Sequence, residues 1–159
     1  MKKKCLVGLL VLIALCLAGI IPSPAFAGTD VSGMISTNTT WSASASPYTV
    51  TGGILVKSGA TLTIQPGVTI KIGAGLSFQI EGALVARGTS SSKITFTCNV
   101  TDPKPENWGY ILFKDSSVDA DTGTSGSYVA GSIMEHCVVE YAGASSNYAL
   151  RAGRGTPVY

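Results

Sequence analysis

The acidic residues that could bind a metal ion lie close together between positions 115 and 121. Asp119, Asp121 and Gly123 form an Asp-x-Asp-x-Gly pattern, and Asp115 precedes it in the same Gly/Ser/Asp-rich stretch. A hard cation such as Ca²⁺ requires several oxygen ligands, and this pattern supplies two carboxylates on a tight bend. Because no closing glutamate follows within the stretch, a solvated turn is the alternative interpretation. Asp119 and Asp121 are therefore candidate Ca²⁺ ligands, and the sequence predicts no other cofactor.

The single histidine of the chain, His136, lies in a strand-like run between two glutamates. Paired with Glu135 or Glu140, it could act as an acid or base in glycoside hydrolysis or in a lyase reaction. Adjacent residues of a strand point to opposite faces, however, so Glu135 and His136 do not converge. Lys114, the basic residue nearest to the aspartates, occupies a position where any solvent-facing strand could carry a lysine. We expect His136 to lie at a bend, and we assign no catalytic residue.

The elements that would position these side chains are short strands separated by regularly spaced glycines. Between positions 53 and 98 a glycine recurs every six to eight residues, and the interval from each glycine to the third one after it is nearly constant. These glycines are Gly53, Gly59, Gly67, Gly75, Gly82 and Gly88. The runs between them are rich in Ile, Val, Leu, Thr and Phe, which favour a pleated, half-buried surface. A repeat of about 22 residues with three strands and three turns predicts a β-solenoid.

Alternation within the repeat assigns the two faces of each strand. The residues expected to face the core are Leu62, Ile64, Ile70, Ile72, Leu76, Phe78 and Ile80. Polar residues fall between them and are expected to face solvent. We expect Ile94 and Phe96 to occupy the positions of Ile70 and Ile72 one coil later. Because this interval is longer than the repeat, it implies a two-residue insertion at the corner before Ile94.

Residues 1–27 have the pattern of a secretory signal peptide. MKKK is followed by an unbroken apolar run from Cys5 to Ile21 and by Ala25-Phe26-Ala27, a small-x-small cleavage pattern. An uncleaved membrane anchor is the alternative. The pattern therefore predicts a secreted or cell-surface protein whose mature form does not span the membrane.

Removal of this segment changes the charge balance of the chain. Three of the eleven basic residues leave with it, so that eight basic and nine acidic residues remain, a net charge of −1. Without a basic patch or a basic amphipathic helix, the mature chain is not expected to bind nucleic acid or a membrane surface. The remaining residues are enough for one domain with its own core.

Two cysteines, Cys98 and Cys137, remain after the signal peptide. In an exported chain they could form a disulfide. The alternative is that each is a small buried hydrophobic residue on its own strand. The sequence leaves both interpretations open.

Residues 28–47 are rich in Ser and Thr and show no sustained period, so we expect them to form an N-terminal cap on coils that run from 48 to 159. Trp41 is expected to plug the open end of the core, with a sugar-stacking platform as the alternative. Trp108, directly before Gly109, is expected to pack against the edge of a coil, and an exposed glycan contact is again the alternative.

Four phrases of the sequence resemble a known family. SGATLTIQPGVTIKIG, EGALVARGTSSSKITFTC, ENWGYILFKDSS and MEHCVVEYAG are similar, in this order, to the opening coils of secreted right-handed parallel β-helix proteins of the pectin-lyase-like superfamily. The resemblance covers about residues 48–145 and implies an all-β, right-handed parallel β-helix of about four coils. It is specific for fold and not for activity, because this architecture carries lyases, hydrolases, adhesins and surface fibres.

The chain stops soon after another coil begins near Tyr148 and Leu150, without a polar capping segment. We therefore expect an N-terminal fragment with further coils or domains beyond it. The favoured function is structural, adhesive or glycan-binding, at the cell surface or outside the cell, with polysaccharide or a surface glycan as the partner and without catalysis in this fragment. The alternative is the N-terminal part of a polysaccharide lyase or glycoside hydrolase of the same superfamily.

Overall fold

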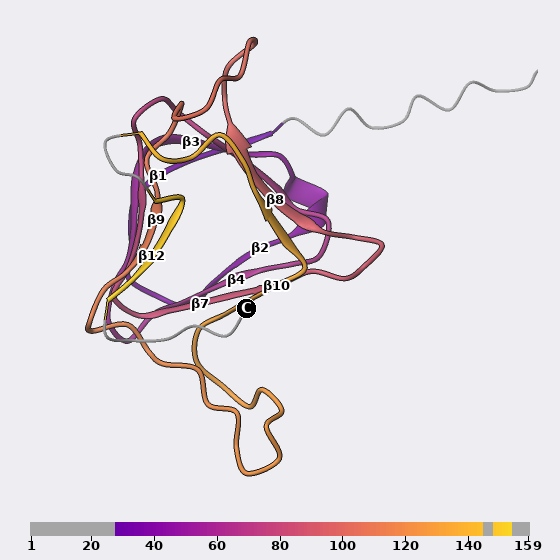
Figure 1. The fold of residues 1–159 in the computed structure, drawn as a ribbon, viewed down its shortest axis with the longest axis vertical. Helices are drawn as coiled ribbons and strands as arrows, with labels where there is room; N and C mark the ends of the chain where they lie inside the picture. The colour runs from indigo at the N-terminus through magenta and orange to yellow at the C-terminus, as the bar shows by residue number, and fades with distance from the viewer. Residues whose placement is uncertain (1–27, 145–147, 154–159) are drawn as a thin grey trace, which may run out of the picture.

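The chain winds into a parallel β-helix whose coils enclose one continuous hydrophobic core (Figure 1). The structure is a computed structural model that describes residues 28–144 and 148–153. The predicted signal peptide, residues 1–27, lies outside the described residues. Within the described ranges, every regular element apart from the short 3-10 helix η1 (Ala43–Ala45) is a β-strand, and all pairs between named strands are parallel. Among the described residues, no helix has the length and apolar character needed to cross a membrane.

The strands form three walls around a roughly triangular cross-section (Figure 1). The β4 wall is a four-stranded sheet, and its strands are β2 (Thr39–Trp41), β4 (Thr61–Ile64), β7 (Ala83–Arg87) and β10 (Ile133–Glu135). The other two walls belong to one eight-stranded sheet, because β1 (Thr29–Ile35) and β3 (Tyr48–Val56) are long enough to enter both. Beyond β1 and β3, the β5 wall contains β5 (Thr69–Ile72), β8 (Ile94–Cys98) and β11 (Cys137–Val139). The β6 wall correspondingly contains β6 (Phe78–Ile80), β9 (Ile111–Phe113) and β12 (Leu150–Ala152).

The core is built from alternate residues of each strand, as the sequence predicts. Six of the seven expected core residues are buried, and Leu76 is partly buried in a turn against the same core. Fully buried branched and aromatic side chains each contribute about 1.5–3 kcal/mol. The aromatic rings also stack from coil to coil, since the ring centroids of Phe78 and Phe96 lie 6.0 Å apart in an edge-to-face arrangement.

The pairing register between β5 and β8 corrects our prediction. Ile70 lies opposite Phe96 rather than Ile94, and Ile72 lies opposite Cys98 rather than Phe96. The corner before β8 contains an additional turn, in which Thr89 and Ser92 exchange backbone hydrogen bonds of 3.1 and 3.2 Å. The error is two residues, and because the side-chain period of a strand is also two, the inward and outward faces remain as predicted.

Residues 28–47, which we expected to form a cap, contribute β1, β2 and η1, and thereby strands to all three walls. Trp41 is 4% exposed and stacks on Tyr48, with ring centroids 4.7 Å apart. Its side chain therefore belongs to the core, as the packing interpretation predicts, and does not form an exposed sugar-stacking platform.

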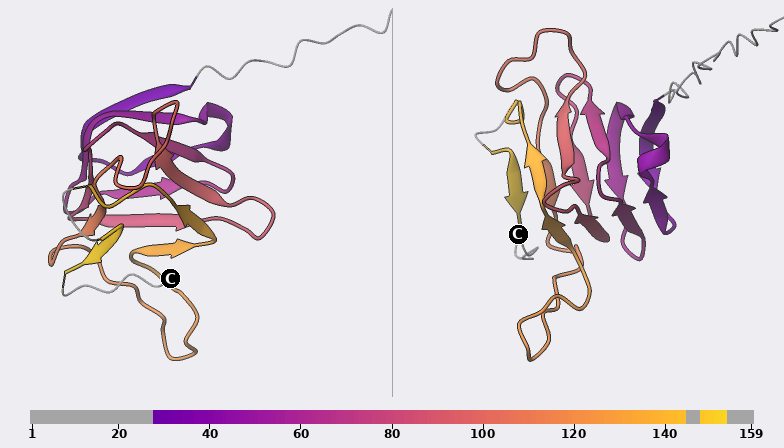
Figure 2. Two further views of the ribbon diagram at one scale, coloured as in Figure 1. Left: turned by 45° about the horizontal axis from the view of Figure 1, so that its top comes forward. Right: turned by 90° about the vertical axis from the view of Figure 1, so that its right-hand side faces the viewer.

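Two long loops leave the coil, residues 99–110 between β8 and β9 and residues 114–132 between β9 and β10 (Figure 2). The first returns at Trp108, which is fully buried and donates a hydrogen bond from Nε1 to the carbonyl oxygen of Glu140 (2.7 Å). This confirms packing rather than glycan contact for Trp108. The second loop projects from the molecule, and its base is held where the amide of Val118 donates to Gly82 and that of Ser132 donates to Val118.

Candidate functional site

The outer face of the β6 wall carries a row of side chains that crosses five successive strands. Residues opposite one another in the register form this row, and they are Met34, Leu55, Gln79, Leu112 and Arg151. Their immediate neighbours along the strands face the core, so these side chains point outward. Neighbouring parallel strands are about 4.8 Å apart, so the row presents one side chain at that interval along the axis of the coil.

A second row of charged residues runs beside the first, directly after β3, β6 and β9. It contains Lys57, Glu81 and Lys114. The Nζ atom of Lys114 lies 3.0 Å from Oε1 of Glu81, and both side chains are partly shielded from solvent. This ion pair balances the charges of Glu81 and Lys114, and Lys57 leaves the row with a formal net charge of +1.

A shallow hollow of about 380 Å³ opens on the outer face of the β6 wall. It is lined by Gly53, Ile54, Leu55, Gly75, Leu76, Ser77 and Gln79. Gly109 packs against two of these residues, because a Cβ atom at position 109 would overlap the Ser77 hydroxyl oxygen and lie 3.0 Å from the carbonyl oxygen of Leu76. The hollow therefore combines exposed backbone, two leucines, a hydroxyl group and a carboxamide.

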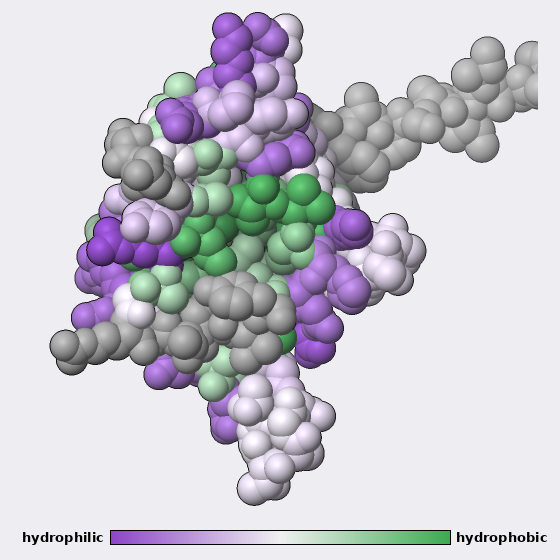
Figure 3. All heavy atoms as spheres, in the orientation of Figure 1, coloured by the Kyte–Doolittle hydropathy of each residue, from purple (hydrophilic) through white to green (hydrophobic). Residues whose placement is uncertain are grey.

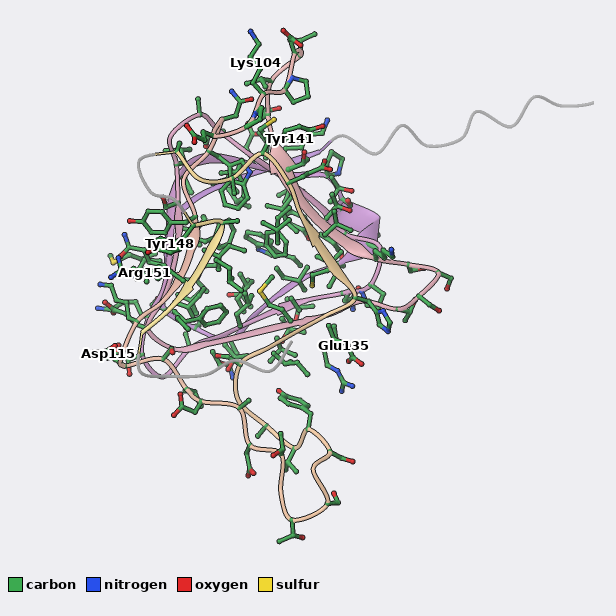
Figure 4. The ribbon with its side chains drawn as sticks, viewed as in Figure 1. Lys104, Asp115, Glu135, Tyr141, Tyr148 and Arg151 are labelled. Carbon is green, nitrogen blue, oxygen red and sulfur yellow. The ribbon has the colours of Figure 1, made fainter. Side chains whose placement is uncertain are left out.

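A second hollow of about 470 Å³ lies further along the same wall. It is lined by Leu112, Phe113, Lys114, Asp115, Ser116, Arg151 and Gly153. Gly153 allows the Asp115 carboxylate to approach the backbone, since a Cβ atom at position 153 would overlap Oδ1 of Asp115. Figure 4 shows Asp115, Arg151 and Tyr148 along this outer side of the molecule. Gln79 lines the first hollow and Leu112 the second, and these residues pair in the register, so the two hollows are neighbours on the wall; together we call them the trough.

The candidate calcium ligands Asp119 and Asp121 lie in the projecting loop and are exposed. The Oδ1 atom of Asp121 accepts a hydrogen bond from the amide of Gly123 (2.8 Å), which closes a local turn. Within residues 28–144 and 148–153, no three His, Cys, Asp or Glu side chains are grouped closely enough to hold a metal ion. Asp121 therefore takes part in a local turn of the projecting loop.

His136 occupies the corner between β10 and β11, with a φ of +48°, and its side chain is exposed. This confirms the predicted bend. The two glutamates considered as its partners contact other residues, because Glu135 forms an ion pair with Arg87 (2.8 Å) and Glu140 accepts a hydrogen bond from Thr97 (2.8 Å). The structure therefore does not bring an acid–base pair together around His136.

The disulfide that the sequence allowed is not formed, and Cys98 and Cys137 are both free thiols. Cys137 lies opposite Ile94 on the neighbouring strand, four residues before Cys98. At about 3.3 Å per residue this separates the two cysteines by roughly 13 Å along the strand direction, beyond the reach of a disulfide. Burial raises the pKa of the Cys137 thiol to about 11, so this group stays protonated at neutral pH.

A separate apolar surface lies at the end of the coil stack formed by β10, β11 and β12 (Figure 3). A hollow of about 250 Å³ at this end is lined by Met134, His136, Cys137, Val139 and Leu150. Its side chains continue the hydrophobic core and contain no group suited to binding a polar ligand other than His136.

The row on the β6 wall could not be predicted from the sequence. Ser77 and Gln79 are among the polar residues expected to face solvent because they alternate with core positions, and the same alternation places Leu55 outward. Long loops of unequal length separate Gln79 from Leu112 and Leu112 from Arg151, so no regular period connects these three residues.

A sequence model described as the pectate-lyase-like beta helix domain matches residues 33–148 of the chain. This match includes the strands of all three walls except part of β1 and all of β12. No curated protein matches the chain, and no solved structure matches it.

Proposed function

The chain belongs to the pectate-lyase-like β-helix family, and from this membership we propose that it is an exported protein that binds an extended glycan along the outer face of its β6 wall without cleaving it. The observation that carries the proposal is the trough, two neighbouring hollows of about 380 and 470 Å³ whose lining residues Gln79 and Leu112 pair in the register. The signal peptide pattern of residues 1–27 supports export.

The chemistry of the trough suits a sugar polymer. Leu55, Leu76 and Leu112 offer apolar surface to the carbon-bound hydrogens of a pyranose ring, while Ser77, Gln79 and Arg151 offer hydrogen-bonding groups to its hydroxyls. Binding sites for such ligands combine a mostly apolar lining with a few polar groups that fix orientation. Because equivalent positions recur at each strand of the wall, a polymer lying along the axis meets a new rung about every 4.8 Å.

Binding without cleavage is supported by the arrangement of the carboxylates on the coil. Glu81, Glu135 and Glu140 each contact a donor, namely Lys114, Arg87 and Thr97. A carboxylate engaged in this way would have to break its contact before it could reach a bound substrate, which opposes a role as general acid.

The test is retention of the full chain on insoluble polysaccharides, together with binding to soluble oligosaccharides measured by calorimetry. Leu112→Ala, in the middle of the trough, should weaken binding by about tenfold through lost apolar contact. The matched control is Val138→Ala, which removes a half-buried, outward-facing aliphatic side chain from the β5 wall. Equal binding by the two variants would contradict the proposed surface, and an absence of glycan binding by the native chain would contradict the function.

The alternative function is a polysaccharide lyase or glycoside hydrolase, and one observation favours it. Lys114, Asp115 and Arg151 line the larger hollow, so a carboxylate and two cations lie at one place on the wall. The corresponding assay follows the release of unsaturated or reducing sugar ends from acidic polysaccharides, with and without Ca²⁺. If the native chain releases such sugar ends and Asp115→Asn does not, the enzymatic function is correct and binding without cleavage is wrong.

A further inference from the structure

Gln79 occupies the centre of the outward row on the β6 wall. In the register it lies between Leu55 on one neighbouring strand and Leu112 on the other. Its side chain is half-buried and lines the smaller hollow. Within residues 28–144 and 148–153, no side chain or backbone group forms a hydrogen bond with its carboxamide. A shielded carboxamide with aliphatic neighbours on two sides therefore remains available to a ligand.

The charges around Gln79 limit the kind of ligand that this position accepts. Glu81, the next outward residue on the same side of the strand, is paired with Lys114. The cation in the row itself, Arg151, lies two strands away from Gln79, beyond Leu112. Lys57 and Lys114 follow the paired residues on the two neighbouring strands, whereas Glu81 lies two positions away on the same strand as Gln79. A carboxylate bound at Gln79 would therefore lose water and lie nearer to the Glu81 carboxylate than to either lysine, which is costly. The centre of the trough thus favours a neutral group.

The neutral sugar substituent that fits an amide flanked by leucines is an acetamido group. Its N–H and C=O are complementary to the acceptor and donors of the Gln79 carboxamide. Its methyl group is apolar and would contact Leu55 or Leu112 about one strand spacing away. A hydroxyl at the same position of the sugar would form fewer hydrogen bonds with the carboxamide than an acetamido group. It would also leave the two leucines in contact with water.

We propose that the β6 wall is selective for an N-acetylated glycan, with the Gln79 carboxamide binding the acetamido group between Leu55 and Leu112. The proposal rests on the proposed function, since it assigns a ligand class to the same trough. It predicts that discrimination between sugars arises at Gln79, whereas the other residues of the trough contribute to the affinity for any glycan.

The experiment compares two neutral oligosaccharides of equal length and linkage, a β-1,4-linked oligomer of N-acetylglucosamine and a β-1,4-linked oligomer of glucose. Calorimetry with the full chain should show about tenfold tighter binding of the N-acetylated oligomer, the effect of one to two well-formed hydrogen bonds and a methyl contact. Gln79→Leu keeps the size of the side chain and removes its hydrogen-bonding groups. This variant should bind both oligomers with nearly equal affinity.

Val138→Ala serves again as the control and should retain the full preference. Equal binding of the two oligomers by the native chain would overturn the selectivity while leaving glycan binding intact. A preference that survives in Gln79→Leu would overturn the role of Gln79. If the native chain bound no polysaccharide at all, the proposed function itself would fail, and the two failures are thereby distinguishable. Circular dichroism of each variant confirms that the β-structure is retained.

Discussion

Lys114 and Glu81 form an ion pair across neighbouring strands of the β6 wall, with Nζ and Oε1 3.0 Å apart. The residues are 33 positions apart in the sequence and are brought together by the pairing of β6 with β9. The pair lies beside the row that contains Gln79, and within it the charges of Lys114 and Glu81 balance each other. Its contribution to stability and its contribution to binding are separable by mutation.

Lys114→Met should lower the free energy of unfolding by no more than about 1 kcal/mol, because partly exposed ion pairs contribute little. Urea denaturation at low and high salt measures this effect, and the difference between native chain and variant should shrink as salt rises. Glu81→Gln is the matched variant. A loss of several kcal/mol in either variant would show that the pair is more deeply desolvated than its exposure indicates.

A glycine is required at position 109 by close approach to Ser77 and Leu76, two residues that line the smaller hollow. Gly109→Ala should destabilise the protein by about 1–3 kcal/mol, because the added methyl group must displace its neighbours. The same change should weaken glycan binding. Gly53→Ala on the same wall is the control, since its Cβ atom would meet only the carbonyl oxygen of Ser77 at 3.8 Å. Thermal unfolding that ranks the two variants equally would contradict the close packing at Gly109.

Cys137 has a pKa raised to about 11, chiefly by burial of the thiol. Because the thiolate is the nucleophile, alkylation by iodoacetamide at pH 8 should be much slower in the folded chain than in urea. A Cys137→Ala variant identifies the contribution of Cys98 to the observed reaction. Rapid modification of Cys137 in the folded protein at pH 8 would be inconsistent with its raised pKa.

The same pKa implies a dependence of stability on pH. The stabilisation from a protonated Cys137 is fully present below the pKa of an unfolded thiol, about 8.5, and is lost as the pH rises through the folded value of about 11. The free energy of unfolding should therefore fall across this range. The fall should be smaller in Cys137→Ala, and identical pH profiles would rule out Cys137 as its cause.

Asp119 and Asp121 provide a test of calcium binding by the projecting loop. Because Asp121 closes a local turn with Gly123 and both aspartates are exposed, we expect added Ca²⁺ to leave the melting temperature unchanged. A calcium site would instead stabilise the protein by about 2.7 kcal/mol when the Ca²⁺ concentration is about 100 times the dissociation constant. A shift on adding Ca²⁺ that disappears in an Asp119→Asn, Asp121→Asn double variant would establish the site.

The inward and outward faces of the strands were determined by the sequence alone. Leu62, Ile70 and Phe78 are buried as predicted, because side-chain alternation is a local property of an extended chain. For the same reason the two-residue error in the register of Phe96 did not exchange the faces. The bend at His136 was also predicted, since the apolar period shifts there within a single run of residues.

Only the tertiary structure decided which outward residues lie side by side. The row that links Gln79, Leu112 and Arg151 depends on pairing between strands separated by loops of unequal length, residues 99–110 and 114–132 among them. Residues inserted into such a loop increase the number of positions between two paired strands along the chain. They do not change how the two strands pair in space. The separation of Cys98 from Cys137 was decided in the same way, because strand register, and not the number of residues between two cysteines, sets the distance between them.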